Sequence, residues 1–110
     1  MGNSKANKML ELKETDFQEW LRQLAIVYGY LYFHTHRSQF SASGFPDMVM
    51  VRLEPKPRLI FAELKTDDLK VSQPSIDQWM WLCILQHIGE PIECYLWRPE
   101  DRDKIEVLLK

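Results

Sequence analysis

The sequence predicts an α/β fold: a mixed sheet of about four strands flanked by helices, in the order αβββαβα. Short apolar runs of strand length alternate with longer segments in which apolar residues recur at helical spacing. Three strand-like runs follow one another after the first helical segment, which indicates antiparallel hairpins. The fourth strand is separated from the third by a helix, so we expect these two strands to be parallel.

Length and composition set the limits. At 110 residues the chain is long enough for one domain with a single core, and we divide it into a flexible N-terminal arm (1–10) and one domain (11–110). No apolar run reaches membrane-spanning length and no signal peptide is visible, so a cytoplasmic location is expected. The net charge of −2 argues against a protein that coats nucleic acid by bulk positive charge. Cys83 and Cys94 lack a metal-ligand or redox spacing and are interpreted as free core thiols.

The first helix is predicted over residues 14–28, with Gly29 as its stop. Its apolar residues share one face at helical spacing: Phe17, Leu21, Leu24, Ala25 and Tyr28. Two acids in or near this helix, Glu14 and Glu19, have two open interpretations. Either one reaches a functional site, or both lie on a solvated helix face.

Strands are predicted over 30–36, 47–53 and 58–65, and the last two are joined by the proline-rich turn 54–57. The loop between the first two strands carries good phosphate donors: Arg37, Ser38, Ser41 and Ser43. His34 and His36 stay ambiguous between a ligand or general-base role and simple hydrogen bonding.

The antiparallel hairpin places the start of the second strand beside the end of the third. Asp47 therefore lies near Glu63 and Lys65, and Phe61, Glu63 and Lys65 share one face of their strand. Charges in an apolar strand are costly unless they are paired or bind a metal. Two carboxylates with a lysine beside them predict a site for a hard divalent cation such as Mg²⁺.

A second helix is predicted over 75–88, a fourth strand over 92–97, and a last helix from Arg98. The second helix looks buried over most of its surface, with the sheet and also a partner chain as candidates for what covers it. A broad apolar stripe, Ile76, Trp79, Met80, Cys83, Ile84 and His87, is extended by Trp81, Leu82 and Leu85. Gln78 is the polar exception, either exposed or a donor near the metal site. The last helix has its predicted apolar side at Ile105, Val107, Leu108 and Leu109.

Five motifs occur in order, and together they resemble the VRR-NUC branch of the PD-(D/E)xK nuclease superfamily, especially its small stand-alone phage and prophage proteins. They are Glu14-Thr15-Asp16-Phe17-Gln18, Gly44-Phe45-Pro46-Asp47, Glu63-Leu64-Lys65, Ser75-Ile76-Asp77-Gln78 and Tyr95-Leu96-Trp97-Arg98-Pro99. The resemblance covers nearly everything after the N-terminal arm and implies a restriction-endonuclease-like fold. The sequence departs from the family's pattern at two points. The segment 67–74 is longer, and Gln73 is a second candidate, beside Gln78, for the glutamine of the family's Ser-x-x-Gln helix.

The resemblance implies a role for each matching residue. Asp47 and Glu63 would bind Mg²⁺ or Mn²⁺, with the Leu64 carbonyl and Glu14 as further ligands and Glu19 as the alternative acid. Lys65 would orient or help deprotonate the attacking water. Gln78 would hold the water, the lysine or a phosphate, and Arg37, Ser38, Ser43 and Ser75 would contact nucleic acid.

The activity implied is metal-dependent hydrolysis of DNA phosphodiesters to 5′-phosphate and 3′-hydroxyl ends. The substrate implied is branched DNA such as four-way junctions, cut by a homodimer in the cytoplasm of a bacterial host. Trp79, Trp81 and Trp97 belong either to that dimer interface or to the core. Two other functions stay open: a non-catalytic nucleic-acid-binding accessory of phage replication or packaging, and a metal-free interaction module with a buried salt-bridge cluster.

Overall fold

The chain folds around one four-stranded mixed sheet, seen in a computed structural model that describes residues 14–35 and 43–110. The strands are β1 (Leu31–His34), β2 (Met48–Arg52), β3 (Arg58–Leu64) and β4 (Ile92–Trp97), in the spatial order β1-β2-β3-β4. The pairs β1–β2 and β2–β3 are antiparallel, and β3–β4 is parallel. The predicted mixed α/β architecture is confirmed. The N-terminal arm predicted over 1–10 lies outside the described residues.

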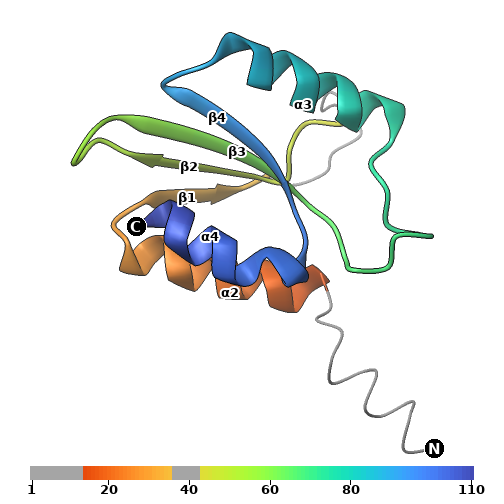
Figure 1. Cartoon of the computed structure of the whole chain (residues 1–110), viewed down its shortest axis with the longest axis horizontal. Helices are drawn as coiled ribbons and strands as arrows, with labels where there is room; N and C mark the ends of the chain where they lie inside the picture. The colour runs from red at the N-terminus through yellow and green to blue at the C-terminus, as the bar shows by residue number, and fades with distance from the viewer. Residues whose placement is uncertain (1–13, 36–42) are drawn as a thin grey trace, which may run out of the picture.

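Helices α2 (Glu14–Val27) and α4 (Arg102–Leu109) cover one face of the sheet, and α3 (Ile76–Ile88) covers the other (Figure 1). A single-turn 3₁₀ helix, Pro99–Asp101, precedes α4. The predicted helix stop is confirmed, because α2 ends at Val27 and Gly29 follows with a φ of 82°. Within the described residues, no helix is long and apolar enough to span a membrane.

The larger core lies between the sheet and the α2–α4 layer. The predicted face of α2 is confirmed: Phe17, Leu21 and Ala25 are buried, and Leu24 and Tyr28 pack against them. From the strands and α4, this core takes Met48, Met50, Ile60, Ala62, Leu64, Trp97, Ile105 and Leu109. The predicted apolar side of the last helix is wrong at Val107, which is 71% exposed because it lies between the inward positions Ile105 and Leu109.

A smaller core lies under α3. Its buried members are Leu82, Leu85 and Cys94, with Phe61, Trp81 and Leu96 packed around them. The predicted burial of α3 by the sheet is therefore wrong at Ile76, Met80 and Ile84, which are exposed in this chain. Burial of these residues by a partner chain stays a prediction. The prediction that both cysteines are core thiols fails at Cys83, which is also exposed; both thiols are free.

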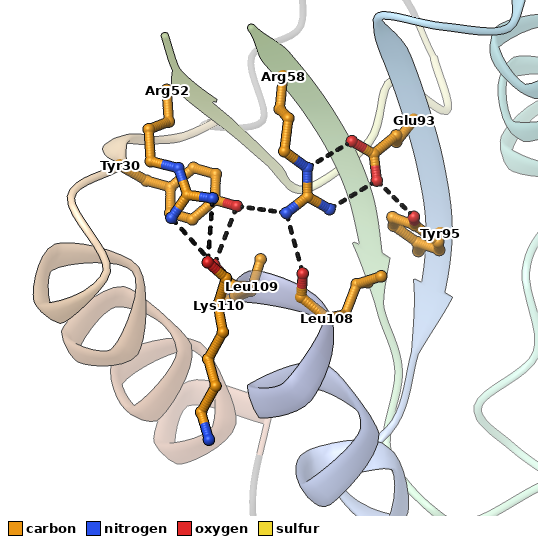
Figure 2. A network of polar contacts seen from close by, with 8 residues as sticks. All are labelled: Tyr30, Arg52, Arg58, Glu93, Tyr95, Leu108, Leu109 and Lys110. Atoms are coloured by element: carbon orange, nitrogen blue, oxygen red, sulfur yellow. Dashed lines mark hydrogen bonds and ion pairs between the residues drawn. The ribbon is translucent and has the colours of Figure 1, made fainter. Parts of the chain in front are cut away.

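Two arginines hold the end of α4 against the sheet (Figure 2). Arg58 forms a bidentate pair with Glu93 (2.7 Å for each contact) and also donates to the Tyr30 hydroxyl and the Leu108 carbonyl. Arg52 donates to the carbonyls of Tyr28, Leu109 and Lys110, and its guanidinium lies 4.3 Å from the centre of the Tyr30 ring. These contacts satisfy carbonyls that a helix C-terminus otherwise leaves unpaired. They fix the α2–α4 layer at the end of the sheet opposite to Asp47 and Glu63.

Candidate active site

Asp47 and Glu63 lie at the same end of two neighbouring strands. Met48 pairs with Ala62, so continuing the antiparallel register by one residue sets Asp47 opposite Glu63. Met48 and Ala62 face the larger core, and strand side chains alternate, so the two carboxylates belong to the α3 side. The hairpin thus brings the two predicted carboxylates together as the sequence indicated.

Asp47 is held by hydrogen bonds from residues at the ends of both adjacent strands, β3 and β1. Its Oδ2 accepts a hydrogen bond from the Leu64 amide (2.8 Å), and its carbonyl accepts from the amide and hydroxyl of Thr35 (2.8 and 3.0 Å). The Thr35 hydroxyl also donates to the Pro46 carbonyl (2.7 Å). Because only one carboxylate oxygen is engaged within the described residues and the side chain is half-buried, Oδ1 remains available to a ligand.

Glu63 is 1% exposed, and a buried carboxylate needs polar partners. Gln78 provides one, since its Nε2 donates to Glu63 Oε1 (3.2 Å). The same glutamine forms a capping box at the start of α3: its Oε1 accepts from the Ser75 amide (2.8 Å), and its own amide donates to Ser75 Oγ (3.2 Å). Gln78 is therefore the buried donor near the site, and it orients Glu63 from the helix terminus.

The loop before Asp47 packs against the start of α3. Gly44 has a φ of +86°, and a Cβ built on it would lie 2.5 Å from the Asp77 carbonyl carbon and 2.7 Å from the Gln78 amide nitrogen. Such contacts are far below van der Waals distance, so only glycine fits here. The Trp81 indole donates to the Ser43 carbonyl (3.1 Å), and the Phe45 ring meets the Trp81 ring edge to face at 5.0 Å. The Gly-x-Pro-Asp segment and the helix carrying Gln78 thus form one packed unit.

Lys65 directly follows β3 and is half-buried. Its amide donates to the Trp97 carbonyl (3.0 Å), which continues the β3–β4 pairing past the end of the strand. In the described parts of the chain, its ammonium group makes no ion pair with a carboxylate. In a salt-bridge cluster of Asp47, Glu63 and Lys65, this ammonium group would pair with one of the two carboxylates. Here it is available to an anionic ligand.

The two candidate acids of the first helix have different placements. Glu14 is the first residue of α2, and its side chain lies outside what the structure describes. Since α2 runs back into β1, this first turn lies at the same end of the sheet as the two carboxylates (Figure 1). Glu19 lies on the exposed surface, where hydrogen bonds from Arg22 (2.6 and 2.9 Å) and Gln23 lower its pKa to about 2.

The remaining predicted residues are distributed around this site. Ser43 is exposed and Ser75 is the N-cap of α3, so the Ser75 hydroxyl is engaged in the helix. Gln73 is exposed and donates to the Leu69 carbonyl, which leaves Gln78 as the helix glutamine. His34 ends β1 and is half-buried. Three others, His36, Arg37 and Ser38, lie outside the described residues, as does Ser41.

Sequence reasoning missed Arg98. It is 7% exposed and donates to the carbonyls of Thr66 and Ser72 (2.8 Å for Ser72), which ties both ends of the crossover loop to the end of β4. This loop connects Lys65 to α3. An arginine before a proline carries no signal of burial, so only the path of the loop reveals its role.

The donor set suits a hard cation. Asp47 supplies an available carboxylate oxygen and Glu63 a buried carboxylate, and oxygen ligands are what Mg²⁺ and Mn²⁺ prefer. Within the described residues, no group of three or more His, Cys, Asp or Glu side chains gathers as a metal site. The pair therefore forms a partial shell of the kind that Mg²⁺ completes with water and substrate phosphate.

Comparison with known proteins adds no assignment: no family model, no curated protein and no solved structure matches this chain.

Proposed function

We propose that this chain is a Mg²⁺- or Mn²⁺-dependent deoxyribonuclease of the VRR-NUC type that hydrolyses phosphodiester bonds. The observation that carries the proposal is the pairing of Asp47 with the buried Glu63 at one end of the sheet, with Gln78 bound to the glutamate. Glu63 and Asp47 supply carboxylate oxygens at the end of two neighbouring strands, and carboxylate oxygens are the ligands that a hard divalent cation prefers.

Asp47 and Glu63 would hold the metal, and both are oriented before it binds. The Leu64 amide fixes Asp47, and Gln78 fixes Glu63. When bound, the cation supplies Lewis-acid chemistry and lowers the pKa of a coordinated water. The Leu64 carbonyl and Glu14 are the further ligands proposed from the resemblance.

Lys65 would act on the phosphate and the attacking water. Lys65 follows Glu63 by two residues, and its ammonium group carries the positive charge that would stabilise the charge developing on a phosphodiester during hydrolysis. Ser43 and Ser75, together with Arg37 and Ser38 from the adjoining loop, would contact the nucleic-acid backbone. The substrate proposed is branched DNA, including four-way junctions, in a phage-infected or prophage-carrying bacterial cell.

The test is cleavage of end-labelled four-way junction, flap, single-stranded and linear duplex DNA, with Mg²⁺, Mn²⁺ or EDTA. Wild type should cut, leaving 5′-phosphate and 3′-hydroxyl ends. Glu63→Gln keeps the shape and an acceptor for Gln78, yet it should lose about 100-fold or more in rate, since a metal contributes several kcal/mol to the transition state. Glu90→Gln, an exposed glutamate at the opposite end of the sheet, is the matched control and should cut like wild type.

Cleavage that Glu63→Gln leaves unchanged would refute the proposal. Intact DNA binding without cleavage of any substrate would favour the accessory-protein alternative. A metal-free module makes a different prediction: the melting temperature of the wild type would not rise on adding Mn²⁺, because no state of the protein would bind it.

A further inference from the structure

Helix α3 covers only part of the sheet face on which Asp47 and Glu63 lie. The small core under this helix takes strand residues from β3 and β4 alone: Phe61, Cys94 and Leu96. Strand β1 is at the opposite edge of the sheet, and in Figure 1 the helix lies beside β4, far from β1. The β1–β2 half of this face therefore has exposed side chains next to the two carboxylates.

The β1–β2 half of the face is apolar. Phe33 pairs with Val49, and Leu31 with Val51, so all four side chains project on the α3 side, opposite to the methionines of β2 in the larger core. Leu31 is 75% exposed and Phe33 60%, and the two valines are partly exposed. An apolar surface thus begins directly beside Asp47 and extends to the edge strand.

Phe33 is an exposed aromatic side chain at the border of the candidate site. Of the aromatic residues that the structure describes, only Phe33 and Trp79 are exposed, and Trp79 belongs to α3. Thr35 lies opposite Asp47, because its amide donates to the Asp47 carbonyl, and Phe33 lies opposite Val49. Phe33 and Asp47 are therefore diagonal neighbours on one face of an antiparallel pair, with side chains about 7–8 Å apart.

The polarity of this surface matches that of a nucleotide. At one end, two carboxylates offer oxygen ligands to a cation that binds phosphate. The adjoining side chains of β1 and β2 are uncharged and apolar, and one of them is an aromatic ring. A nucleotide has the same pattern, since a charged phosphate is joined to a planar base with an apolar face. The reach of a single nucleotide is comparable with the separation of Asp47 and Phe33.

We infer that Phe33 stacks on an unpaired nucleobase next to the phosphate that the carboxylate pair binds. The inference rests on the proposed nuclease function and names the part of the substrate that this site selects. A base inside a duplex is stacked by its neighbours, so it reaches an aromatic side chain only where the strand is unstacked. Stacking on a ring tolerates every base, so Phe33 would select the structure of the strand and not its sequence.

Fluorescence anisotropy with labelled single-stranded and duplex oligonucleotides tests the stacking, with Ca²⁺ as an oxygen-binding cation in place of Mg²⁺. Phe33→Leu keeps an apolar side chain on the strand but removes the ring. It should raise the dissociation constant for the single strand about 10-fold or more. Binding of the duplex should not change, because its bases are already stacked.

Two further variants separate stacking from general apolar contact. Phe33→Trp keeps an aromatic ring and should bind the single strand like wild type. Trp79→Leu is the matched control, because Trp79 is the other exposed aromatic residue and lies on the outside of α3. It should also bind like wild type. Circular dichroism verifies that all variants are folded, which their exposed positions favour.

A photochemical experiment locates the stacked base directly. Irradiated 5-iodouracil forms an adduct with an aromatic ring that is stacked on it. A single-stranded oligonucleotide carrying this base is irradiated with the wild type, and the modified peptide is identified by mass spectrometry. The adduct should form on Phe33, and Phe33→Leu should abolish it.

The outcomes distinguish this inference from the nuclease proposal. Glu63-dependent cleavage, together with unchanged single-strand binding by Phe33→Leu, would overturn the stacking and leave the nuclease intact. Ring-dependent binding without cleavage of any DNA would support the stacking and overturn the nuclease. Equal losses in Phe33→Leu and Phe33→Trp, or the absence of an adduct on Phe33, would also overturn the stacking. A wild type that binds no oligonucleotide would overturn both.

Discussion

Gly44→Ala tests whether the loop before Asp47 is fixed by its contact with α3. The left-handed φ of +86° alone costs an alanine about 1–2 kcal/mol. The new Cβ would also meet the backbone of Asp77 and Gln78 at 2.5–2.7 Å, and backbone at the capped start of a helix cannot move away cheaply. The loop must shift instead.

That shift has a calculable cost. Moving the loop breaks the hydrogen bond from Trp81 to the Ser43 carbonyl, worth about 0.5–1.5 kcal/mol net, and the Phe45–Trp81 ring contact, worth about the same. Gly44→Ala should therefore lose about 2–5 kcal/mol of unfolding free energy in total. This is a large part of the stability of a small domain.

Urea denaturation followed by tryptophan fluorescence and circular dichroism measures the loss. Gly29 and Gly89 are the controls, because both have a φ near +80° but leave room for a Cβ: the nearest atom to Gly29 is 3.8 Å away, and nothing lies within 4 Å of Gly89. Their alanine variants should show only the backbone cost. If Gly44→Ala loses no more stability than the two controls, the contact with α3 does not fix the loop and the reasoning is wrong.

Three further predictions concern single groups. The hydrogen bond from Arg58 lowers the pKa of Glu93 in the folded protein. The ionised Glu93 therefore stabilises the fold fully above the ordinary carboxyl pKa, and this contribution is lost as pH falls through the lower, folded value. Glu93→Gln should reduce the loss of unfolding free energy at acid pH, measured by urea denaturation. Burial raises the pKa of Cys94 to about 11, so a thiol reagent at pH 8 should modify Cys83 rapidly in the native protein and Cys94 only after denaturation. Gln78→Ala removes half of the capping box and the partner of a buried carboxylate, and should cost about 1–3 kcal/mol in the same denaturation assay, whereas an unchanged midpoint would contradict the role assigned to the glutamine.

Most of the architecture could be predicted because two periodicities are clear in the sequence. The face of α2 follows from the spacing of Phe17, Leu21 and Ala25, because most of the positions between them are polar. The juxtaposition of Asp47 and Glu63 follows from the hairpin, since the turn length fixes which residues pair.

The orientation of α3 could not be predicted in the same way. Apolar residues occupy nearly every position of this helix, so spacing alone does not distinguish the side that faces the sheet. Gln78 marks the inward side, contrary to the usual expectation for a glutamine, because Glu63 gives it a buried partner. Gly44 and Arg98 were likewise beyond sequence reasoning, since their roles depend on segments more than 25 residues away that only folding brings near.

The two cores on either side of the sheet are unequal, and this has a kinetic consequence. The α2–α4 layer shares twelve buried residues and the arginine contacts of Figure 2, whereas α3 rests on three buried residues. Segments with few buried contacts open locally at a lower free energy, so amide protons of α3 should exchange with solvent well before those of α2. Gln78 belongs to the layer that opens first. The glutamate it holds can therefore be released and recaptured while the rest of the sheet stays folded, on a timescale that native-state hydrogen exchange can resolve.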